Sequence, residues 1–479
     1  MAHTADTLPH LMLGPLPKRL VTEHRIPLDL IPVYGSNVVG ISEVLKGLKK
    51  LRERLRAEGK EVPVDPVTGR GLPLGVLPPL REHQVQAVQS FVKDGTSLSG
   101  TLDAPPGFGK TFTSLHIAKN GPGAVLILVP TTIARDQWCK TLRTRGVSTF
   151  VLGEDRVFRW GENGAILATY WLMTTKHTAL SDQLSETLSK VLTVSYGTLI
   201  LDEVHKVPAP IFSTVCGMVF RQTTIGCTAT LVRSDGKIAD LDTLIGGPVR
   251  FSITYDALTE QGLFPKVEDS VLSVPMHADF ADRMEDGAFN KQLLTTLNPN
   301  KLSLASALVR EHQQKSIVFC DWVRALPHVA SFLRATQPFF PVLGPLSGAS
   351  NARERESTLS AFRGLPTGVL VISRIGEMAL DVPDAAVCIQ ISHTRSAEAA
   401  VQRRGRITRK AEGKQPKSYI LVSQDTAEAQ NTEGATNAGD VEDVEEPVRT
   451  VLLEACRNAD EKREQPSKKR KRPKLLGCR

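Results

Sequence analysis

Short, continuous apolar runs separated by helical stretches dominate the middle of the chain. Each run is rich in Val, Ile, Leu and Ala and ends in polar residues. The runs span residues 124–129, 165–168, 198–201 and 224–227, and later 315–320, 368–373 and 386–392. Uninterrupted apolar runs of this kind are typical of strands buried on both faces of a parallel sheet. The pattern predicts an α/β protein whose functional residues lie at the carboxyl ends of its strands.

The two ends of the chain break this pattern. Residues 1–76 are rich in Pro and Gly, and within them residues 41–58 form an amphipathic helical pattern with Lys and Arg opposite the apolar face. Such a helix either packs on a core or contacts nucleic acid, and the sequence leaves both open. Residues 425–446 carry eight acidic and no basic side chains, which predicts disorder, and residues 447–457 have the spacing of a short helix.

Composition limits the class of protein. A chain of 479 residues is too long for a single ordinary core, and 41% hydrophobic with 23% charged residues is the balance of a soluble globular protein. We expect an intracellular protein without a membrane partner, because there is no apolar N-terminal signal and no apolar run near the 18 residues that span a bilayer. The seven cysteines include no C-x-x-C pair, so neither zinc nor an iron–sulfur cluster is predicted.

The net charge of +8 is distributed unevenly. Residues 462–479 hold nine Lys or Arg and one Glu, including the run from Lys468 to Lys474. Such a run directs nuclear import, contacts nucleic acid or is merely solvated, and all three remain open here. The basic balance permits a polyanionic partner.

Residues 104–111, Ala-Pro-Pro-Gly-Phe-Gly-Lys-Thr, have the composition of a phosphate-binding loop. Gly107 and Gly109 allow a tight turn and a close backbone approach to phosphate oxygens. Lys110 supplies a positive charge, Thr111 supplies a hydroxyl for Mg²⁺, and a helical stretch follows. Ala104 stands where the motif G-x-x-x-x-G-K-[ST] has its first glycine. The loop predicts binding of a nucleotide's phosphates together with Mg²⁺.

A pair of carboxylates follows the apolar run 198–201. Asp202 at a strand end is placed to hold Mg²⁺ beside the β- and γ-phosphates, and Glu203 is placed to orient or deprotonate the attacking water. Upstream, Gln84 carries an amide that both donates and accepts, as adenine recognition requires, although a surface glutamine has the same sequence signature. The predicted nucleotide contacts are Gln84, Ala104, Pro105, Pro106, Gly107, Phe108, Gly109, Lys110 and Thr111.

Several ordered motifs together resemble a known family. They are residues 228–238 (Thr-Ala-Thr-Leu-Val-Arg-Ser-Asp-Gly-Lys-Ile), 244–248 (Leu-Ile-Gly-Gly-Pro), 297–301 (Leu-Asn-Pro-Asn-Lys), 374–383 and 402–409 (Gln-Arg-Arg-Gly-Arg-Ile-Thr-Arg). With the phosphate loop and the Asp-Glu-Val-His segment, residues 77–424 resemble the superfamily-two nucleic-acid helicases, in particular the XPB-like branch and its viral relatives. Ser234 stands where that branch has Glu.

The resemblance implies a mechanism. It implies two RecA-like domains with ATP between them, Gln402, Arg406 and Arg409 completing the catalytic site with Lys110 and Glu203, and domain movement along a nucleic-acid strand. Arg403 and Arg404 better suit a phosphate backbone. Phosphate-backbone contacts are expected at Thr131, Arg135, Thr169 and Ser373. Coupling between the two sites is expected at Asp202, Glu203, Val204, His205, Thr228, Ala229, Thr230, Gly376 and Asp381.

The resulting domain hypothesis has five parts: residues 1–76 as an accessory region, 77–252 and 301–424 as RecA-like domains, 253–300 as a connector, and 425–479 as an acidic linker, short helix and basic tail. DNA is the favoured substrate, with transcription, repair or replication proteins as partners. An RNA helicase is the alternative enzyme, although DEAD-box proteins carry Asp-Glu-Ala-Asp and Ser-Ala-Thr where this chain has Asp-Glu-Val-His and Thr-Ala-Thr. A binding subunit without turnover is the other alternative.

Overall fold

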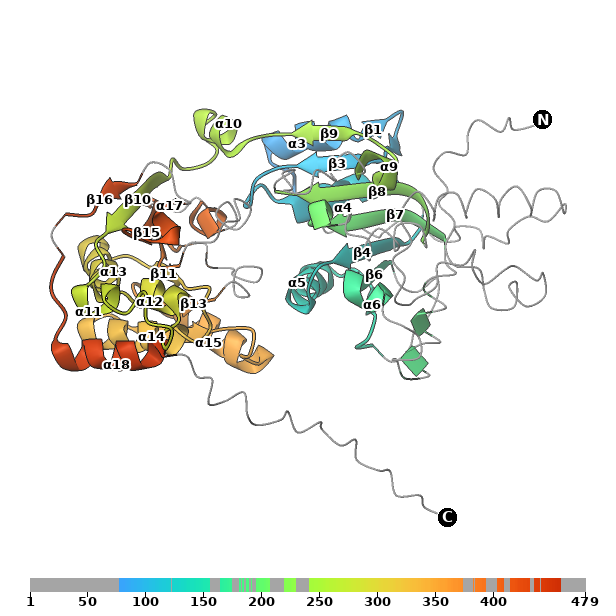
Figure 1. Cartoon of the computed structure of the whole chain (residues 1–479). Helices are drawn as coiled ribbons and strands as arrows, with labels where there is room; N and C mark the ends of the chain where they lie inside the picture. Colours follow the sequence, from blue (N-terminus) through green and yellow to red (C-terminus); the bar gives the residue numbers. More distant parts are fainter. Residues whose placement is uncertain are drawn as a thin grey trace, which may run out of the picture. The chain divides into compact units, whose positions relative to one another are not determined.

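The computed structural model divides the chain into two compact units, each with its own sheet (Figure 1). One unit comprises Met1–Pro265 with Ala400–Gly405, and the other comprises Lys266–Ala399 with Arg406–Arg479. The structure describes residues 77–121, 123–155, 164–174, 195–206, 219–229, 241–373, 382, 384–392, 403–408, 414–430, 435–439 and 441–457, with positions 181, 183–184, 187–188 and 191. The helical pattern at 41–58 and the basic run 468–474 lie outside these residues.

The first unit contains a seven-stranded sheet in the order β5-β6-β4-β7-β8-β3-β9, and all its neighbouring strands are parallel. The strands are β3 (Gly100–Asp103), β4 (Val125–Val129), β5 (Thr149–Val151), β6 (Ala165–Thr169), β7 (Ser195–Asp202), β8 (Phe220–Thr228) and β9 (Val249–Ser252). The predicted runs at 124–129, 165–168, 198–201 and 224–227 therefore form neighbouring strands, as their lack of alternation indicated.

Both faces of this sheet are buried. Along β4, Val125, Ile127 and Val129 belong to one hydrophobic cluster, whereas Leu126 and Leu128 belong to another. Because successive strand residues point to opposite faces, the two clusters lie on the two sides of the sheet. The described helices of this unit are α3 (Glu82–Ser90), α4 (Lys110–Ala118), α5 (Thr132–Arg143), α6 (Tyr170–Thr174), the 3₁₀ turn η4 (Val204–Lys206), α9 (Leu241–Ile245) and α10 (Tyr255–Glu260), beside the hairpin β1 (Val92–Lys93) and β2 (Thr96–Ser97).

The second unit repeats this plan with the strand order β12-β13-β11-β14-β15-β10-β16, again with parallel neighbours. Its strands are β10 (Glu268–Val274), β11 (Ser316–Phe319), β12 (Val342–Leu346), β13 (Val369–Ile372), β14 (Val387–Gln390), β15 (Lys417–Ser423) and β16 (Thr436–Asn437). Its described helices are α11 (Ala278–Ala281), α12 (Lys291–Thr296), α13 (Pro299–His312), α14 (Leu326–Thr336), α15 (Ala352–Gly364), α17 (Ala427–Gln430) and α18 (Glu446–Cys456). The predicted α/β class with two parallel-sheet domains is confirmed.

The expected connector at 253–300 is divided between the two units. Leu258 and Phe264, on and after α10, are buried in the core of the first unit. Strand β10 pairs with β15 from Glu268↔Lys417 to Val274↔Ser423 inside the second sheet. The boundary between the units therefore falls at Pro265, because apolar side chains on both sides of it join a core.

The prediction of disorder for 425–446 is wrong where the structure describes this segment, since it contains α17 and β16. The charge of Glu428 on α17 is compensated by Lys301 of α13, whose Nζ lies 2.5 Å from Glu428 Oε2. Glu442 accepts from Ser303 through its main-chain carbonyl and from Arg310 through its carboxylate. The composition of this segment indicated disorder because it contains acidic residues without basic ones. The compensating cations lie elsewhere in the chain, on α13.

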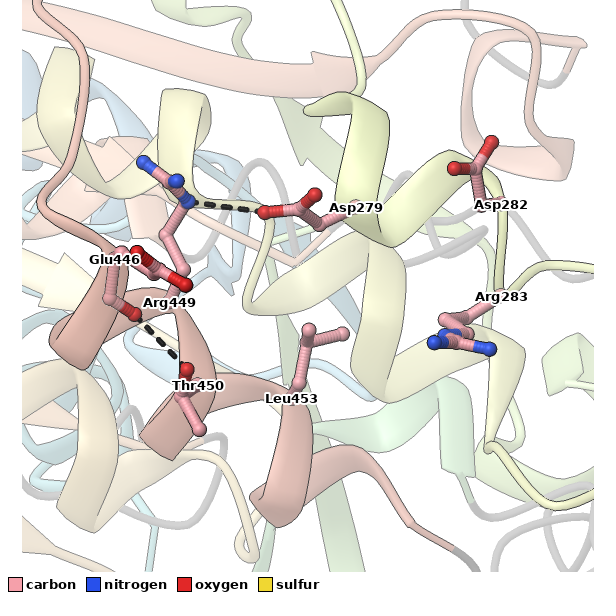
Figure 2. A pocket seen from close by; sticks show the side chains of 7 residues that line it. All are labelled: Asp279, Asp282, Arg283, Glu446, Arg449, Thr450 and Leu453. Atoms are coloured by element: carbon pink, nitrogen blue, oxygen red, sulfur yellow. Dashed lines mark hydrogen bonds and ion pairs between the residues drawn. The ribbon is translucent and has the colours of Figure 1, made fainter.

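Helix α18 belongs to the second unit rather than to a tail. It packs beside α12, and its Leu452 and Cys456 side chains are buried in the core of this unit. A pocket of about 330 Å³ lies between α11 and α18. Arg449 Nε donates to Asp279 Oδ2 there at 3.0 Å, and Leu453 also lines the pocket (Figure 2). This pocket contains none of the predicted site residues. None of the helices in the described ranges combines the length and apolar character that a bilayer crossing requires.

Candidate active site

The phosphate loop lies between β3 and α4, as predicted. Gly107 and Gly109 have φ values of +87° and +93°, a region that residues with a Cβ rarely occupy. Ala104 is not among the described residues with positive φ, so an alanine replaces the first glycine of the motif without backbone strain. Gly109 is the N-cap of α4, whose free N–H groups and dipole favour an anion.

Lys110 lies over its own loop. Its Nζ donates to the carbonyl oxygens of Ala104 at 2.7 Å and Pro105 at 3.3 Å. Burial lowers the pKa of Lys110, and the carboxylates of Glu203 and Asp202 oppose this shift. A phosphate would offer this cation a charged acceptor in place of two neutral carbonyls. The loop therefore fits a nucleotide's phosphates.

Gln84 supports the loop from α3. Its Nε2 donates to the main-chain oxygen of Phe108 at 2.8 Å, and its Oε1 accepts from the main-chain N–H of Arg81 at 2.9 Å. A Cβ on Gly109 would lie 2.3 Å from Gln84 Nε2, closer than atoms approach. The oxygen and the nitrogen of the side-chain amide are both hydrogen-bonded to the main chain, so Gln84 positions the loop. The adenine contact expected from the sequence stays a prediction.

Asp202 is the last residue of β7, and Glu203 directly follows it. Asp202 Oδ2 accepts from the indole Nε1–H of Trp138 at 2.9 Å, and Oδ1 accepts from the main-chain N–H of Glu203 at 3.1 Å. Burial, followed by the nearby Glu203 carboxylate, raises the pKa of Asp202 to about 6. A divalent cation would stabilise the charged form that burial disfavours.

Glu203 is held in an unusual conformation. Its φ of +51° lies in the left-handed region, and strain of this kind is concentrated at functional sites. Its Oε2 is buried, accepts no hydrogen bond among the described residues, and lies 3.5 Å from His205 Nδ1. An acceptor without a donor is suited to hold a water molecule.

The predicted coupling residues are close together where they are described. His205 Nδ1 lies 2.8 Å from Thr228 Oγ1, and the main-chain oxygen of Thr228 accepts from the N–H of Ala104. The Asp-Glu-Val-His segment is thus linked through Thr228 to the start of the phosphate loop. Ala229 directly follows β8, and Val204 is buried. Thr230, Gly376 and Asp381 lie outside the described residues.

The donor set fits Mg²⁺. Among the described residues, no three His, Cys, Asp or Glu side chains form a group that holds a metal ion. Mg²⁺ is usually bound by one or two carboxylates together with substrate phosphates and water rather than by a protein cage. Asp202 and Thr111, the second residue of α4, supply the one carboxylate and one hydroxyl that this mode needs.

The expected nucleic-acid contacts have different outcomes. Thr131 is the N-cap of α5 and is partly exposed, whereas Thr169 at the end of β6 and Ser373 after β13 are buried. The contact expected at Arg135 stays a prediction. Its side chain is 9% exposed and its guanidinium pairs with Asp136 at 2.8 Å and with Glu154, so a phosphate would have to compete with these two carboxylates.

The arginine-rich segment is described only at residues 403–408. Arg406 is half-buried and belongs to the second unit, whereas Gln402 and Arg409 lie outside the described residues. Arg403 is fully buried and the Arg404 guanidinium lies 4.4 Å from the Tyr255 ring centroid, within the first unit. The suggestion that Arg403 contacts a phosphate backbone therefore does not fit its burial.

Two aromatic residues near Asp202 were not identified from the sequence. Trp138 donates to the Asp202 carboxylate, and the Tyr170 hydroxyl donates to the Asp202 main-chain oxygen at 2.9 Å. Tyr170 directly follows a predicted strand and Trp138 lies in the helical stretch after another, but an aromatic residue at helical spacing has the same signature when it only fills a core.

Comparison with known proteins shows similarity to helicases. Residues 258–434 match the family described as ERCC3/RAD25/XPB C-terminal helicase, and residues 77–233 match the type III restriction enzyme res subunit. The chain is 32% identical over 373 residues to the "General transcription and DNA repair factor IIH helicase/translocase subunit XPB" of Enterocytozoon bieneusi (strain H348), covering 73% of this chain and 59% of that protein. It is 32% identical over 370 residues to the protein of the same name in Dictyostelium discoideum, covering 73% and 44%.

A solved structure shares the fold. Mss116p (NTE and C-tail double deletion) bound to ssRNA and AMP-PNP superposes with a TM-score of 0.53 at 17% identity, covering 79% of this chain and 80% of that one. This likeness supports a RecA-like fold for the two parallel-sheet units described above. The chain spans less than two thirds of the length of the curated relatives it matches. By these matches residues 77–434 resemble the XPB-like branch of the superfamily-two helicases.

Proposed function

We propose that this protein is an ATP-dependent translocase that moves along DNA. The observation that carries this proposal lies at the carboxyl ends of the strands in the first unit. There the loop that contains Lys110 follows β3, and the Asp202–Glu203 pair lies at the end of β7 in the same parallel sheet. This arrangement supplies a cation for the phosphates, a carboxylate for their metal ion and a second carboxylate for water.

Each residue has a stated role in the proposed hydrolysis. Lys110 exchanges the carbonyls of Ala104 and Pro105 for the β- and γ-phosphates. Asp202 and Thr111 would hold Mg²⁺, which when bound neutralises charge on the phosphates. Glu203 Oε2, which accepts no hydrogen bond among the described residues, would accept a proton from the attacking water.

The family resemblance indicates that the second unit supplies arginine side chains to the ATP site. We propose that Arg406 and Arg409 reach the γ-phosphate as arginine fingers, with Gln402 beside them, so that the site is complete only when the two units close. Closing and opening would then advance the protein along the strand, with Thr131 as a phosphate-backbone contact. Thr169 and Ser373 remain proposed contacts that would require local rearrangement because they are buried.

DNA is favoured over RNA because the two relatives are named as subunits of a transcription and DNA repair factor. We extend the same relatives' context to this chain and propose transcription or repair proteins as partners and a nuclear location, which the basic run Lys468 to Lys474 supports.

The test is phosphate release measured with no polynucleotide, duplex DNA, single-stranded DNA and RNA. We expect the highest rate with DNA and no turnover by the Lys110→Ala variant. Displacement of a triplex-forming strand from duplex DNA then distinguishes duplex translocation from strand separation. A rate of phosphate release that no polynucleotide changes would contradict a translocase. Stimulation by RNA alone would favour the RNA helicase. Nucleotide binding without turnover by the wild type would indicate a binding subunit.

A further inference from the structure

Asp202 receives a hydrogen bond from each side of the first sheet. Trp138 Nε1 donates to its Oδ2 at 2.9 Å, and Tyr170 Oη donates to its main-chain oxygen at 2.9 Å. Trp138 belongs to the hydrophobic cluster on one face of the sheet and Tyr170 to the cluster on the other. Side chain and backbone of one carboxylate residue are thus held from opposite faces.

Both donors belong to elements that begin at a predicted nucleic-acid contact. Trp138 lies on α5, whose N-cap is Thr131, and seven residues span about two helical turns, which places Trp138 on the same side of α5 as Thr131. Tyr170 directly follows Thr169 at the end of β6. In the sheet, β4 pairs in parallel with both β6 and β7, so the carboxyl ends of these strands, and Asp202 with them, lie at the same end of the sheet.

Each threonine keeps a donor for a phosphate. Thr131 Oγ1 accepts from the N–H of Ala134 and Thr169 Oγ1 accepts from the N–H of Leu172, both inside the local turn. A hydroxyl that accepts from the backbone retains its own proton to donate. A phosphate bound at Thr131 would therefore act on the first turn of α5, and a helix transmits such a displacement along its axis as a nearly rigid body.

We propose that Trp138 and Tyr170 are positioning residues that orient the Asp202 carboxylate for Mg²⁺ and make that orientation depend on nucleic acid bound at the start of α5 and the end of β6. This rests on the proposed function. With Oδ1 bonded to the N–H of Glu203 and Oδ2 to Trp138, the plane of the carboxylate is fixed and each oxygen keeps one lone pair. A displacement of α5 moves the donor on Oδ2 and so rotates the metal-binding group.

The proposed role differs from simple core packing because it depends on the N–H group of Trp138 and the O–H group of Tyr170 rather than on their rings. Partners that orient a metal ligand typically change metal affinity by about 10–100-fold when they are removed. A buried ring that only fills space would change stability alone.

The chain offers a matched control for Tyr170. Tyr196 on β7 is likewise fully buried in the same cluster, and its hydroxyl donates to the main-chain oxygen of Val191 at 2.8 Å. Tyr196→Phe therefore removes a buried Tyr-to-carbonyl hydrogen bond of the same kind, away from Asp202. The two test variants are Trp138→Phe, which keeps an aromatic ring without the donor, and Tyr170→Phe.

The experiment uses the full chain and measures three quantities for each variant: the melting temperature, the Mg²⁺ concentration that half-saturates binding of a fluorescent ATP analogue, and the ratio of ATP turnover with and without DNA. We expect Trp138→Phe and Tyr170→Phe to raise the half-saturating Mg²⁺ concentration about tenfold and to lower the DNA stimulation. Tyr196→Phe should lower the melting temperature to a similar extent and leave the other two quantities at wild-type values.

The inference is overturned if both test variants lose stability like Tyr196→Phe but bind the Mg²⁺-dependent analogue as the wild type does. An equal loss of Mg²⁺-dependent analogue binding in all three variants, Tyr196→Phe included, would also overturn it. A wild type that binds the analogue without hydrolysing ATP would contradict the proposed function only, because the Mg²⁺ dependence of binding still decides the role of Trp138 and Tyr170.

Discussion

Lys301 on α13 and Glu428 on α17 form an ion pair with an Nζ–Oε2 distance of 2.5 Å, although they lie 127 positions apart along the chain. Lys301 is fully buried, and its Nζ also donates to the main-chain oxygen of Ile391 at 3.1 Å. A buried charge that loses its partner is strongly destabilising. This pair makes the acidic segment part of the second unit.

Truncation of the chain after residue 424 should therefore destabilise the second unit, because it removes Glu428 and the buried face of α18. Glu428→Gln alone should lower the free energy of unfolding by about 3 kcal/mol, since it leaves Lys301 charged and unpaired. Truncation after residue 457 keeps both features and should melt like the full chain. The measurement is a thermal melt of each form, and equal melting of the 424 and 457 truncations would contradict the assignment.

A rescue variant tests the ion pair itself. Combining Lys301→Met with Glu428→Gln removes both charges and should recover much of the stability lost by Glu428→Gln, because an apolar side chain replaces the buried ammonium group. A double variant as unstable as the single one would show that packing around Glu428, rather than its charge, matters.

Gly109→Ala should abolish ATP binding. The added Cβ would lie 2.3 Å from Gln84 Nε2 on a backbone with φ of +93°, so both the loop and its hydrogen bond to Gln84 must shift. Gly146→Ala is the control, because Gly146 has a φ of +71° and no atom lies within 4 Å of the position that its added methyl group would take. It should cost only about 1 kcal/mol of backbone strain and bind ATP normally. Equal affinity for a fluorescent ATP analogue in both variants would contradict the role of the Gln84 contact.

Glu203→Gln should bind ATP with near-normal affinity and hydrolyse it at least about 100-fold more slowly, because an amide cannot take a proton from water. Asp202, the proposed Mg²⁺ ligand, is unchanged in this variant. Affinity by fluorescence titration and single-turnover hydrolysis separate the two effects. Loss of ATP binding with an unchanged rate per bound nucleotide would mean that the roles of the two acids are reversed.

Protonation of His312 should contribute to loss of stability in mild acid. Its ring stacks on Tyr419 with centroids 5.5 Å apart, its Nε2 lies 2.7 Å from Tyr419 Oη, and burial lowers the pKa of His312 below the usual value near 6.5. The unfolded chain then binds the proton more readily, so this contribution is complete above pH 6.5 and decreases as the pH falls below it. The free energy of unfolding, measured with urea between pH 8 and 5, should fall more steeply below pH 6.5 for the wild type than for His312→Gln. The same pH dependence in both proteins would show that His312 does not contribute.

The sequence alone determined the features that arise within short segments. Continuous apolar runs specified the parallel strands, since a strand buried on both faces needs no alternation. The glycines at 107 and 109 and the lysine at 110 specified the phosphate loop, because only a few residue types tolerate positive φ and bind phosphate. The acids at 202 and 203 were found because they follow such a strand directly.

Only the tertiary structure decided which distant residues meet. Arg135 was predicted to contact a phosphate, and only the fold shows that its guanidinium pairs with Glu154, a residue beyond the next strand. Residues 425–446 were expected to be disordered, yet Glu428 and Glu442 face Lys301 and Arg310 of α13. Trp138 and Tyr170 have no distinctive sequence pattern, and their contact with Asp202 depends on the order of β6, β4 and β7 in the sheet. A linear pattern records the charge and polarity of each residue, but whether a charge is solvated or compensated depends on the partner that folding brings opposite it.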